Sequence, residues 1–461
     1  MSVLPTPSSE ADLEVDTLII GAGCAGLVAA LAAHEAGQDV LVLERDAVPS
    51  GSTALSAGLI PAAGTAQQKA SEITDTPELF ASDIMRKADG EPDPELVQAL
   101  TESSAEVIAW LTDTHDLPFT LVDDFDYPGH RHRRMHGLPS RSGEALINAL
   151  REACESKGIL IAVERIVGTL YADNDTVTGI LATLPDGSEE HIACGRLILA
   201  CNGFGGNTEM VRDLTPAIAG ALYFGHEGNQ GDAIAWGKLL GAQMADLGSY
   251  QGHGNVAHPH GILITWAVIT QGGFQVNANG ERFWDESQGY SEAARHVLAQ
   301  PNGLAYAIFD ARIADIARQF KDFEDAETQS AVKTADTVEG LAETLGLDAE
   351  ALQTSFASAS GTDAFGRTFD PSLNLAPPYC AVKVTGALFH TQGGLKVDGN
   401  ARVLHADGTP FPNLFATGGA AGGVSGSADS GYLSGNGLLS AAVLGYRAGR
   451  FTLTTGEHAH A

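Results

Sequence analysis

Three glycines at fixed spacing, Gly21, Gly23 and Gly26, stand between an apolar run and an Ala- and Leu-rich segment. A second apolar run, Val40–Leu43, ends in the acid Glu44. This order of strand, glycine turn, helix, strand and acid is typical of a dinucleotide site. Gly21 would make the tight turn, Gly23 would admit a pyrophosphate, and Gly26 would allow close packing of helix on strand. The helix start would bind the phosphates and Glu44 the ribose, so we expect a bound dinucleotide.

A second group of residues that could do chemistry is the basic cluster at residues 130–136, in the segment HRHRRMHG that ends at Gly137. It stands in a chain whose formal net charge is -32. Two interpretations are open. The cluster is either a solvated turn that pairs with surface acids, or a pocket wall that holds an anionic part of a substrate or cofactor. In the second case Arg131 and Arg134 would bind the anion, and Tyr127 would line the pocket.

The composition excludes several classes of partner. With 58 acids against 26 bases, the chain has no general electrostatic attraction to nucleic acid or to anionic membranes. Its five cysteines are scattered and form no CxxC, haem-attachment or iron–sulfur spacing, so we expect no metal. Residues 1–16 are polar and acidic, unlike a signal peptide, and no apolar stretch is long enough to span a bilayer. We therefore expect a cytoplasmic protein without membrane partners.

Hydrophobic periodicity predicts the elements that must position these residues. Expected helices cover residues 93–115, 142–157, 231–241, 312–319, 337–345, 348–357 and 438–447. Expected strands cover 160–163, 168–171, 176–184, 191–194, 196–201, 394–397 and 414–417. A hairpin is expected around the turn at Asn279 and Gly280.

The composition changes near residue 248, where aromatic and polar residues become frequent, and the strand-and-glycine pattern returns after about residue 376. We expect an α/β protein in which 1–247 and 376–461 form one Rossmann-like domain. An α+β domain, 248–375, is expected to be inserted in it. The glycine-rich run between the last strand and the last helix is interpreted as a second backbone cradle.

Taken in order, the motifs resemble those of flavoproteins of the fumarate reductase and 3-ketosteroid dehydrogenase group. They are GAGCAG with Glu44, GSTALSAG, ILACNGFGGN, NQGDAIAWGKLLGA, NANGERFWDE, HTQGGLKVD, NLFATGGAAGG and GNGLLSA. The resemblance covers nearly the whole chain. It implies FAD as the dinucleotide and a cap domain inserted in the FAD-binding domain. The group's covalent flavin linkage needs a histidine in the loop that holds GSTALSAG, and none is present, so we expect FAD to be bound non-covalently.

By position, the resemblance assigns the following residues to FAD: Gly21, Gly23, Cys24, Ala25, Gly26, Glu44, Arg45, Gly51, Ser52, Thr53, Ser56, Gly58, Val167, Asn202, Asp232, Gly418, Asn436 and Leu438. The last helix would direct its N-terminus at the pyrimidine edge of the flavin and stabilise the anionic reduced ring. Family members often carry an acid or amide after ATG, where this chain has Gly419, so weaker binding of FAD is expected.

The residues at two positions distinguish the two branches of this group. Fumarate reductase-like enzymes use an arginine four residues after the glutamate of GxRFxxE, and a second arginine in GxNRLGGN. Here Tyr290 and Tyr432 stand at these places, as in the ketosteroid branch. The resemblance implies Tyr290 as the base, with Tyr432 and the backbone N–H of Asn436 polarising a carbonyl. The alternative is that both tyrosines are ordinary half-buried aromatic residues, although the chain has only nine.

His390, in HTQGG, keeps the histidine that fumarate reductase-like enzymes use on a substrate carboxylate, and His253 is a further candidate. We therefore expect an FAD-dependent dehydrogenase that introduces a C=C bond α,β to the carbonyl of a cyclic ketone. The ring would be a 3-ketosteroid or a smaller ketone such as 4-oxocyclohexanecarboxylate, with oxygen or an electron carrier as acceptor. A fumarate reductase-like reductase of an unsaturated carboxylate is the alternative, and a non-catalytic flavoprotein is a third possibility.

Overall fold

The computed structural model describes residues 1–123, 126–429 and 431–453. The chain forms two compact units. The first consists of Met1–Leu214, Gly225–Tyr250 and His390–Ala461, and the second of Thr215–Phe224 and Gln251–Phe389. These divisions differ from 247/248 and 375/376. The reason is that β18 (Tyr379–Thr391) pairs along its first half with β16 (Leu304–Asp310), and that β11 (Leu222–Tyr223) also pairs with β18.

A nine-stranded sheet is the centre of the first unit. Its middle strands are parallel, in the order β7, β3, β2, β10 and β21. Every residue of β3 is buried, as expected for a parallel strand covered on both faces. The antiparallel pair β8 and β9 extends the sheet from the first half of β10. The strands are β1 (Ser2–Leu4), β2 (Leu13–Ile20), β3 (Val40–Leu43), β7 (Leu160–Ala162), β8 (Ile166–Asp173), β9 (Thr176–Thr183), β10 (Glu189–Leu199), β20 (Arg402–Leu404) and β21 (Pro410–Ala416).

The expectation of separate strands at 191–194 and 196–201 is corrected by β10, which is one continuous strand through Gly195. One edge of β10 pairs with β2 from Ile192 to Leu199, while the other edge pairs first with β9 and then, from Leu197, with β21, so that edge changes partner without a break in the strand. The expected helices at 93–115, 142–157 and 231–241 are α5 (Pro94–Asp113), α6 (Gly143–Ser156) and α8 (Asp232–Leu240).

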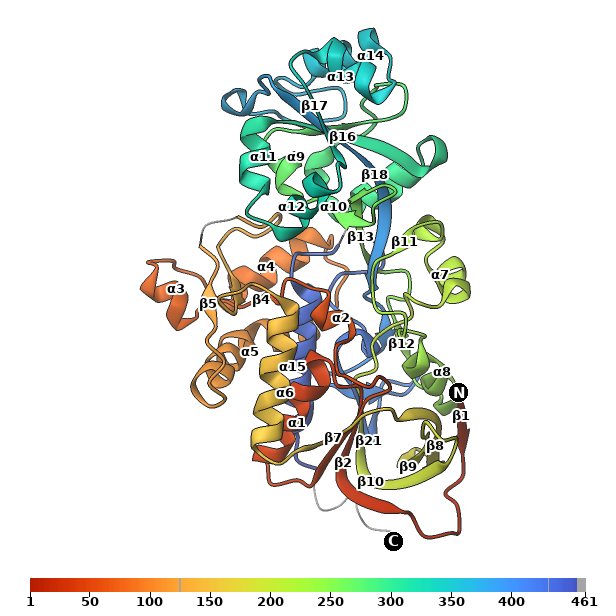
Figure 1. Ribbon diagram of the computed structural model, residues 1–461. Coiled ribbons are helices and arrows are strands. Elements are labelled where there is room, and N and C mark those ends of the chain that lie inside the picture. Colours follow the sequence, from red (N-terminus) through yellow and green to blue (C-terminus); the bar gives the residue numbers. More distant parts are fainter. Residues whose placement is uncertain (124–125, 430, 454–461) are drawn as a thin grey trace. The chain divides into compact units, whose positions relative to one another are not determined.

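Helix α1 (Cys24–Glu35) packs against α6 and against α15 (Asn436–Arg450), and the three helices lie alongside one another (Figure 1). A Cβ added at Gly445 would lie 2.5 Å from the Ala25 carbonyl oxygen, and one at Gly449 would lie 2.4 Å from that of Ala29. Glycine is therefore required for this close backbone approach. The packing holds the second half of α15 against the first turns of α1.

A three-stranded sheet in the order β4, β6, β5 carries the end of the basic cluster, and β12 pairs with β19. The remaining elements of the first unit are α2 (Gly51–Ala54), β4 (Ile60–Pro61), α3 (Ala66–Ala70), α4 (Pro77–Lys87), β5 (Thr120–Leu121), β6 (Met135–Gly137), α7 (Thr208–Leu214), β12 (Met244–Ala245), β19 (Gly394–Leu395) and the 3-10 turn η5 (Gly418–Ala420).

A seven-stranded sheet forms the second unit, with the central order β14, β13, β18, β16 and β15 and with β11 and β17 also paired to β18. Helices pack on it around Phe274, Phe309 and Phe323, which are fully buried. The further elements are η1 (Pro216–Ile218), β13 (Tyr250–Ala257), β14 (Ile262–Leu263), α9 (Ala267–Thr270), β15 (Phe274–Val276), η2 (Glu286–Gln288), α10 (Tyr290–Leu298), η3 (Pro301–Gly303), α11 (Ala311–Ala317), α12 (Lys321–Thr328), β17 (Val332–Ala335), α13 (Val338–Leu345), α14 (Ala349–Ser358) and η4 (Pro371–Leu373).

The hairpin expected at Asn279 and Gly280 is corrected. The turn forms, with Gly280 at φ +83°, but β15 pairs with β16 rather than with the residues that follow the turn. Those residues include Arg282 and Glu286, whose charged groups are buried in ion pairs, and they run into η2 instead of a strand.

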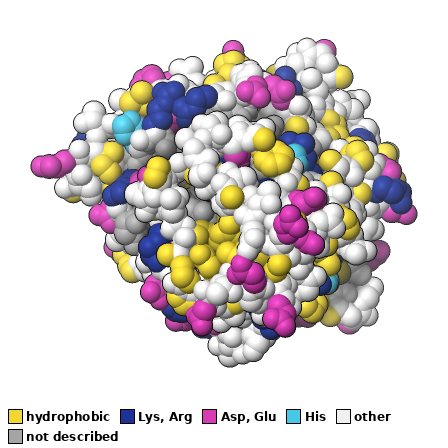
Figure 2. Space-filling view, turned by 90° about the horizontal axis from the view of Figure 1, so that it is seen from above, with side chains coloured by type: hydrophobic (Ala, Val, Ile, Leu, Met, Phe, Trp, Pro, Cys, Tyr) yellow, Lys and Arg dark blue, Asp and Glu magenta, His cyan; other side chains and the backbone are white. Residues whose placement is uncertain are grey.

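Within the described part of the chain, no helix has the length and apolar character needed to cross a bilayer. Figure 2 shows one face of the molecule, on which Asp and Glu side chains are dispersed and interleaved with Lys and Arg. The excess of acids therefore forms no single charged patch on that face.

Candidate active site

The glycine turn before α1 has the expected division of roles. Gly21 adopts φ +104°, and a Cβ there would lie 2.5 Å from the Ala200 carbonyl oxygen. A Cβ at Gly26 would lie 1.9 Å from the Gly21 carbonyl oxygen. At Gly23 the nearest atom to an added Cβ is the Thr53 hydroxyl, at 3.6 Å. Packing thus requires Gly21 and Gly26, while the space beside Gly23 is open for a ligand.

Glu44 lies at the end of β3 and is 8% exposed. Its Oε2 accepts a hydrogen bond from the Ala22 N–H (2.9 Å), and its Oε1 accepts one from the Asp46 N–H (3.0 Å). Each carboxylate oxygen retains a second lone pair for a ribose hydroxyl. Glu44 therefore braces the glycine turn besides being available to the ribose.

The small-residue loop with α2 is tied to the glycine turn. The Thr53 hydroxyl accepts a hydrogen bond from the Cys24 N–H at 3.0 Å. Ser52 Oγ accepts from the side-chain amides of Asn202 (3.0 Å) and Asn229 (2.9 Å). The structure thus brings Cys24, Ser52, Thr53 and Asn202 together. Asn229 was not predicted, although it stands within the quoted motif NQGD.

The end of the same loop is anchored at the start of α6. Ser56 Oγ donates to the Thr53 carbonyl oxygen (2.7 Å) and accepts from the Gly58 N–H (3.0 Å). A Cβ at Gly58, which has φ +66°, would lie 2.7 Å from the Ser142 carbonyl oxygen. Gly51, with φ +53°, has no atom near an added Cβ. The loop is therefore held rigidly at one end and lies open at the other.

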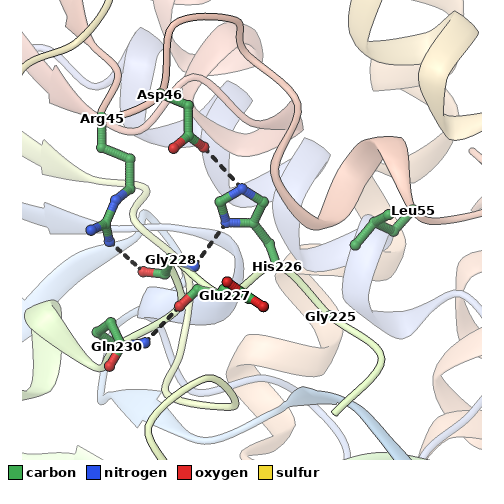
Figure 3. A pocket seen from close by; sticks show the side chains of 8 residues that line it. All are labelled: Arg45, Asp46, Leu55, Gly225, His226, Glu227, Gly228 and Gln230. Atoms are coloured by element: carbon green, nitrogen blue, oxygen red, sulfur yellow. Dashed lines mark hydrogen bonds and ion pairs between the residues drawn. The ribbon is translucent and has the colours of Figure 1, made fainter.

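Arg45 lines an open pocket of about 620 Å³ (Figure 3). Its Nη1 donates to the Gly228 carbonyl oxygen at 2.7 Å, and His226 Nε2 lies 2.9 Å from an Asp46 carboxylate oxygen. Burial raises the pKa of Asp232, the first residue of α8, and the charge of Arg45 opposes that shift. His226 was missed by the sequence analysis, since nothing near it in the chain marks it.

Val167 is buried on β8. Two residues before it, the Arg165 N–H donates to the Glu44 carbonyl oxygen at 2.8 Å, which joins the chain just before β8 to the end of β3.

Three buried polar oxygens between the end of β21 and the first turns of α15 have no hydrogen-bond partner among the described residues. They are Thr417 Oγ1, Asn436 Oδ1 and Ser440 Oγ. Buried polar groups in proteins are nearly always paired. These oxygens are free to bind a polar ligand, and the hydroxyl groups and ring nitrogens of FAD are suitable partners. Together with the open space beside Gly23, these oxygens show that the residues present fit the cofactor.

Gly419 stands beside the amide of Asn202. A Cβ at position 419 would lie 2.1 Å from Asn202 Oδ1, so the Asn202 side chain occupies this space. An amide is therefore present here although residue 419 is glycine. Its Nδ2 donates to Ser52 Oγ and its Oδ1 accepts from the Gly203 N–H, and weaker binding of FAD stays a prediction. The neighbouring Gly418 adopts φ +57°.

Tyr432 lies at the start of α15 and is 7% exposed. Burial raises the pKa of Tyr432, and hydrogen bonds from the backbone N–H groups of Gly435 and Gly437 to the phenol oxygen oppose that rise. The His390 ring lies edge-on to the Tyr432 ring, with 5.7 Å between centroids. The two residues are thus side by side, as a shared site requires.

His390 is held as a neutral ring. Gln392 Nε2 lies 2.6 Å from His390 Nδ1. The Thr391 carbonyl oxygen lies 3.4 Å from the same Nδ1. An amide nitrogen only donates, so the shorter contact with Gln392 favours an accepting Nδ1 and a proton on Nε2. Burial lowers the pKa of His390 to about 4. A Cβ at Gly437 would lie 3.1 Å from His390 Nε2, which places this N–H at the start of α15.

The role expected for the Asn436 backbone is corrected. Its N–H donates to the Leu433 carbonyl oxygen at 3.0 Å, so this amide is engaged within the turn. Helix α15 begins at Asn436 rather than at Leu438, and the N–H groups of Gly435 and Gly437 are those at the Tyr432 oxygen.

Tyr290 and His253 are brought together in the second unit. Tyr290 is the first residue of α10, and the His253 ring stacks on it with 5.0 Å between centroids and an interplanar angle of 17°. The Asn255 N–H donates to His253 Nδ1 at 3.2 Å, so the proton of this ring is on Nε2. Burial lowers the pKa of His253 to about 3. His253 is thus a neutral partner and not a cation for a carboxylate.

The basic cluster matches neither interpretation completely. Arg134 is fully buried and donates twice to Asp75 (2.6 and 2.9 Å) and once to Asp83 (2.5 Å). It pairs with acids, but these acids are buried too, and the expectation that Arg134 binds substrate is corrected. Arg131, half exposed, lies 3.1 Å from Asp83. Tyr127 packs in a small hydrophobic cluster with Leu59, Val122 and Met135.

Comparison with known proteins agrees with this geometry. Residues 16–438 match the family described as FAD binding domain. The chain belongs to this family. It is an FAD-dependent oxidoreductase of the type that acts on carbon–carbon single and double bonds. It shares the fold of an FAD-binding domain carrying mixed α and β elements.

The similar proteins come from both branches. A probable fumarate reductase of Shewanella frigidimarina is 32% identical over 443 residues, which cover 94% of this chain and 74% of the relative. The open form of a flavocytochrome c3 fumarate reductase has TM-score 0.81 and 31% identity, covering 95% of this chain and 78% of that one. A 3-ketosteroid-Δ4-(5α)-dehydrogenase from Rhodococcus jostii has TM-score 0.78 and 27% identity, covering 97% and 99%.

Proposed function

We propose that this protein is a dehydrogenase that introduces a C=C bond α,β to the carbonyl of a cyclic ketone. The observation that carries the proposal is the set of neutral donors at the start of α15. They are the Tyr432 hydroxyl, whose oxygen accepts from backbone N–H groups, and the Nε2–H of neutral His390. Neutral donors suit a ketone oxygen that gains partial negative charge. A carboxylate is instead usually held by a cation such as arginine.

In the proposed reaction Tyr290 takes the proton from the α carbon and Tyr432 donates a hydrogen bond to the carbonyl oxygen as enolate charge develops. Bound FAD supplies the acceptor for the hydride lost from the β carbon. The stacked, neutral ring of His253 holds the Tyr290 ring in place. The chain's own residues thus take the proton and stabilise the enolate charge, while FAD, when bound, would supply the oxidant, with oxygen or an electron carrier as the final acceptor.

We propose a 3-ketosteroid or a smaller ring such as 4-oxocyclohexanecarboxylate as substrate, and non-covalent FAD. The steroid is supported by the similarity to the ketosteroid dehydrogenase, 99% of which this chain covers. Heat or acid treatment that releases all flavin into the supernatant supports the non-covalent state, whereas flavin that stays with the precipitated chain contradicts it.

A reductase of an unsaturated carboxylate is the second candidate. It is favoured by the identity to the fumarate reductase relatives and by the presence of His390. It is opposed by Tyr290 and Tyr432, which stand where the resemblance places the two arginines. The candidates therefore differ in the direction of electron flow, which can be measured.

The experiment is rapid-mixing flavin reduction by a panel of cyclic ketones, with Tyr290→Phe and Tyr432→Phe. Each variant is expected to slow flavin reduction by roughly a hundredfold or more, because it removes the base or a carbonyl donor. Tyr306→Phe, the same change at a tyrosine on β16, is the matched control and is expected to leave the rate unchanged. Equal rates in all three variants contradict the proposal.

A further inference from the structure

The peptide bond between Ser434 and Gly435 is held at both ends. Its carbonyl oxygen lies 2.9 Å from His130 Nε2. A carbonyl oxygen accepts, so His130 carries its proton on Nε2 and donates it. The N–H of the same peptide is one of the two backbone donors at the Tyr432 oxygen. Among the described residues the cis bonds lie elsewhere, so this peptide is trans and its C=O and N–H point in opposite directions.

The turn itself does not fix this orientation. Gly435 adopts φ +86° and ψ -5°, and glycine accepts both signs of φ at little cost. Rotation of the peptide would turn its carbonyl toward the phenol of Tyr432 and its N–H away. Gly435 cannot be replaced to stiffen the turn, because a Cβ there would lie 2.7 Å from Pro61 Cδ. A partner outside the turn is therefore needed.

His130 is in turn held by Arg134. Arg134 Nη1 lies 3.4 Å from His130 Nδ1, and a guanidinium only donates, which favours the tautomer with the proton on Nε2. Asp75 and Asp83 fix the guanidinium, and its Cζ lies 4.8 Å from the centroid of the Phe80 ring. Burial and the charge of Arg134 lower the pKa of His130 to about 4, so the ring is neutral at physiological pH.

We propose that His130 is a positioning residue of the reaction site. By donating from Nε2 to the Ser434 carbonyl oxygen, it fixes the Ser434–Gly435 peptide so that the Gly435 N–H faces the Tyr432 oxygen. The phenol then accepts from the backbone and presents its own O–H to the ketone oxygen. The last step rests on the proposed function of Tyr432, whereas the hold on the peptide does not.

The first test follows Tyr432 without substrate, by NMR of protein labelled with ¹³C at the tyrosine ζ carbons. The Tyr432 signal is identified by its loss in Tyr432→Phe. His130→Leu removes the donor and is expected to shift this signal, while His130→Gln, whose amide donates, restores it. His132→Leu, the same change two residues along, is the matched control and leaves the signal in place. An unshifted Tyr432 signal in His130→Leu overturns the proposal.

The second test measures flavin reduction by the ketone that reduces the wild type fastest. His130→Leu is expected to lower the limiting rate roughly ten- to a hundredfold with little change in apparent ketone affinity, and His130→Gln to recover most of it. Should His130→Leu fail to fold, His130→Asn, polar but shorter, replaces it in both tests. If the signal moves but no ketone reduces the flavin, the proposed function fails and the hold on the peptide stands. If a ketone reduces the flavin equally in all variants, His130 has no positioning role.

Discussion

Two buried arginine–carboxylate clusters, one in each unit, support the segments that carry the proposed catalytic tyrosines. In the first unit Arg134 is held by Asp75 and Asp83. In the second unit Arg282 and Arg367 share Glu286, and Arg282 also pairs with Asp363.

The clusters reach their tyrosines in different ways. Glu286 is four residues before Tyr290, so the chain itself carries the constraint from the cluster to α10. Arg134 is far from Tyr432 in sequence and acts through the imidazole of His130 and the Ser434 carbonyl. The comparison teaches that Tyr290 is positioned by a covalent connection, while Tyr432 depends on hydrogen bonds that a single substitution removes.

The largest expected effect is on the second cluster. Glu286→Gln removes the carboxylate that Arg282 and Arg367 share, which leaves Arg282 paired with Asp363 and the Arg367 guanidinium bound to the Ile269 carbonyl oxygen. The Arg282, Glu286 and Arg367 side chains are at most 8% exposed. We expect a loss of about 3–5 kcal/mol in the free energy of unfolding, measured by denaturant titration. Glu281→Gln, at an exposed position five residues earlier, is the control and is expected to change stability by less than about 0.5 kcal/mol. Equal denaturant midpoints for the two variants would show that the cluster does not stabilise the second unit.

Acid is expected to have an intermediate effect on the stability of both units. Each unit contains a buried neutral histidine, so the two units can be compared. His136 donates from Nδ1 to the Arg134 carbonyl oxygen at 2.7 Å, and burial lowers its pKa to about 4. Burial lowers the pKa of His253 to about 3. The unfolded chain binds these protons near pH 6.5, so stability is complete above that pH. It falls as the pH drops from about 6.5 toward 4.

The loss is on the order of 1.4 kcal/mol per histidine per pH unit. Hydrogen exchange resolved by peptide, at pH 7 and pH 5, measures it in each unit separately. His253→Phe is expected to reduce the acid sensitivity of the second unit alone. The exchange rates are corrected for the intrinsic effect of pH. If the corrected rates do not differ between pH 7 and pH 5, the buried histidines do not make the units less stable in acid.

The smallest effect is expected at the edge of the first cluster. Arg131 pairs with Asp83, but its side chain is 45% exposed, and pairs of this kind contribute little. Arg131→Ala is expected to cost less than about 1 kcal/mol and to leave the Tyr432 signal unchanged. A large loss of stability would mean that the exposed ion pair of Arg131, and not the buried Arg134, stabilises this part of the first unit.

The sequence predicted the parts of the site that are local in the chain. The glycine turn, Glu44 and the loop from Gly51 to Gly58 follow from residue types at short spacing, and they lie together as expected. The role of Arg134 was not predictable, because its two acids precede it by more than fifty residues and no local pattern connects them.

The same limit applies to the space beside Gly419, which is filled by the Asn202 side chain from another strand end. It applies equally to Asn436, where the residue type does not reveal that its N–H is used within the turn. The roles expected for Arg134 and for the Asn436 N–H each depended on a single position, and tertiary or turn contacts changed both.

Anaerobic absorbance titration of the flavoprotein tests most directly whether the neutral donors at the start of α15 bind the oxygen of a ketone substrate. The panel contains 3-ketosteroids, cyclohexanone and 4-oxocyclohexanecarboxylate, with fumarate and other unsaturated acids offered to the dithionite-reduced protein. We predict that at least one ketone bleaches the flavin band and that the acids do not reoxidise the reduced protein. Reoxidation by an unsaturated acid, with no bleaching by any ketone, would contradict the account and favour the reductase.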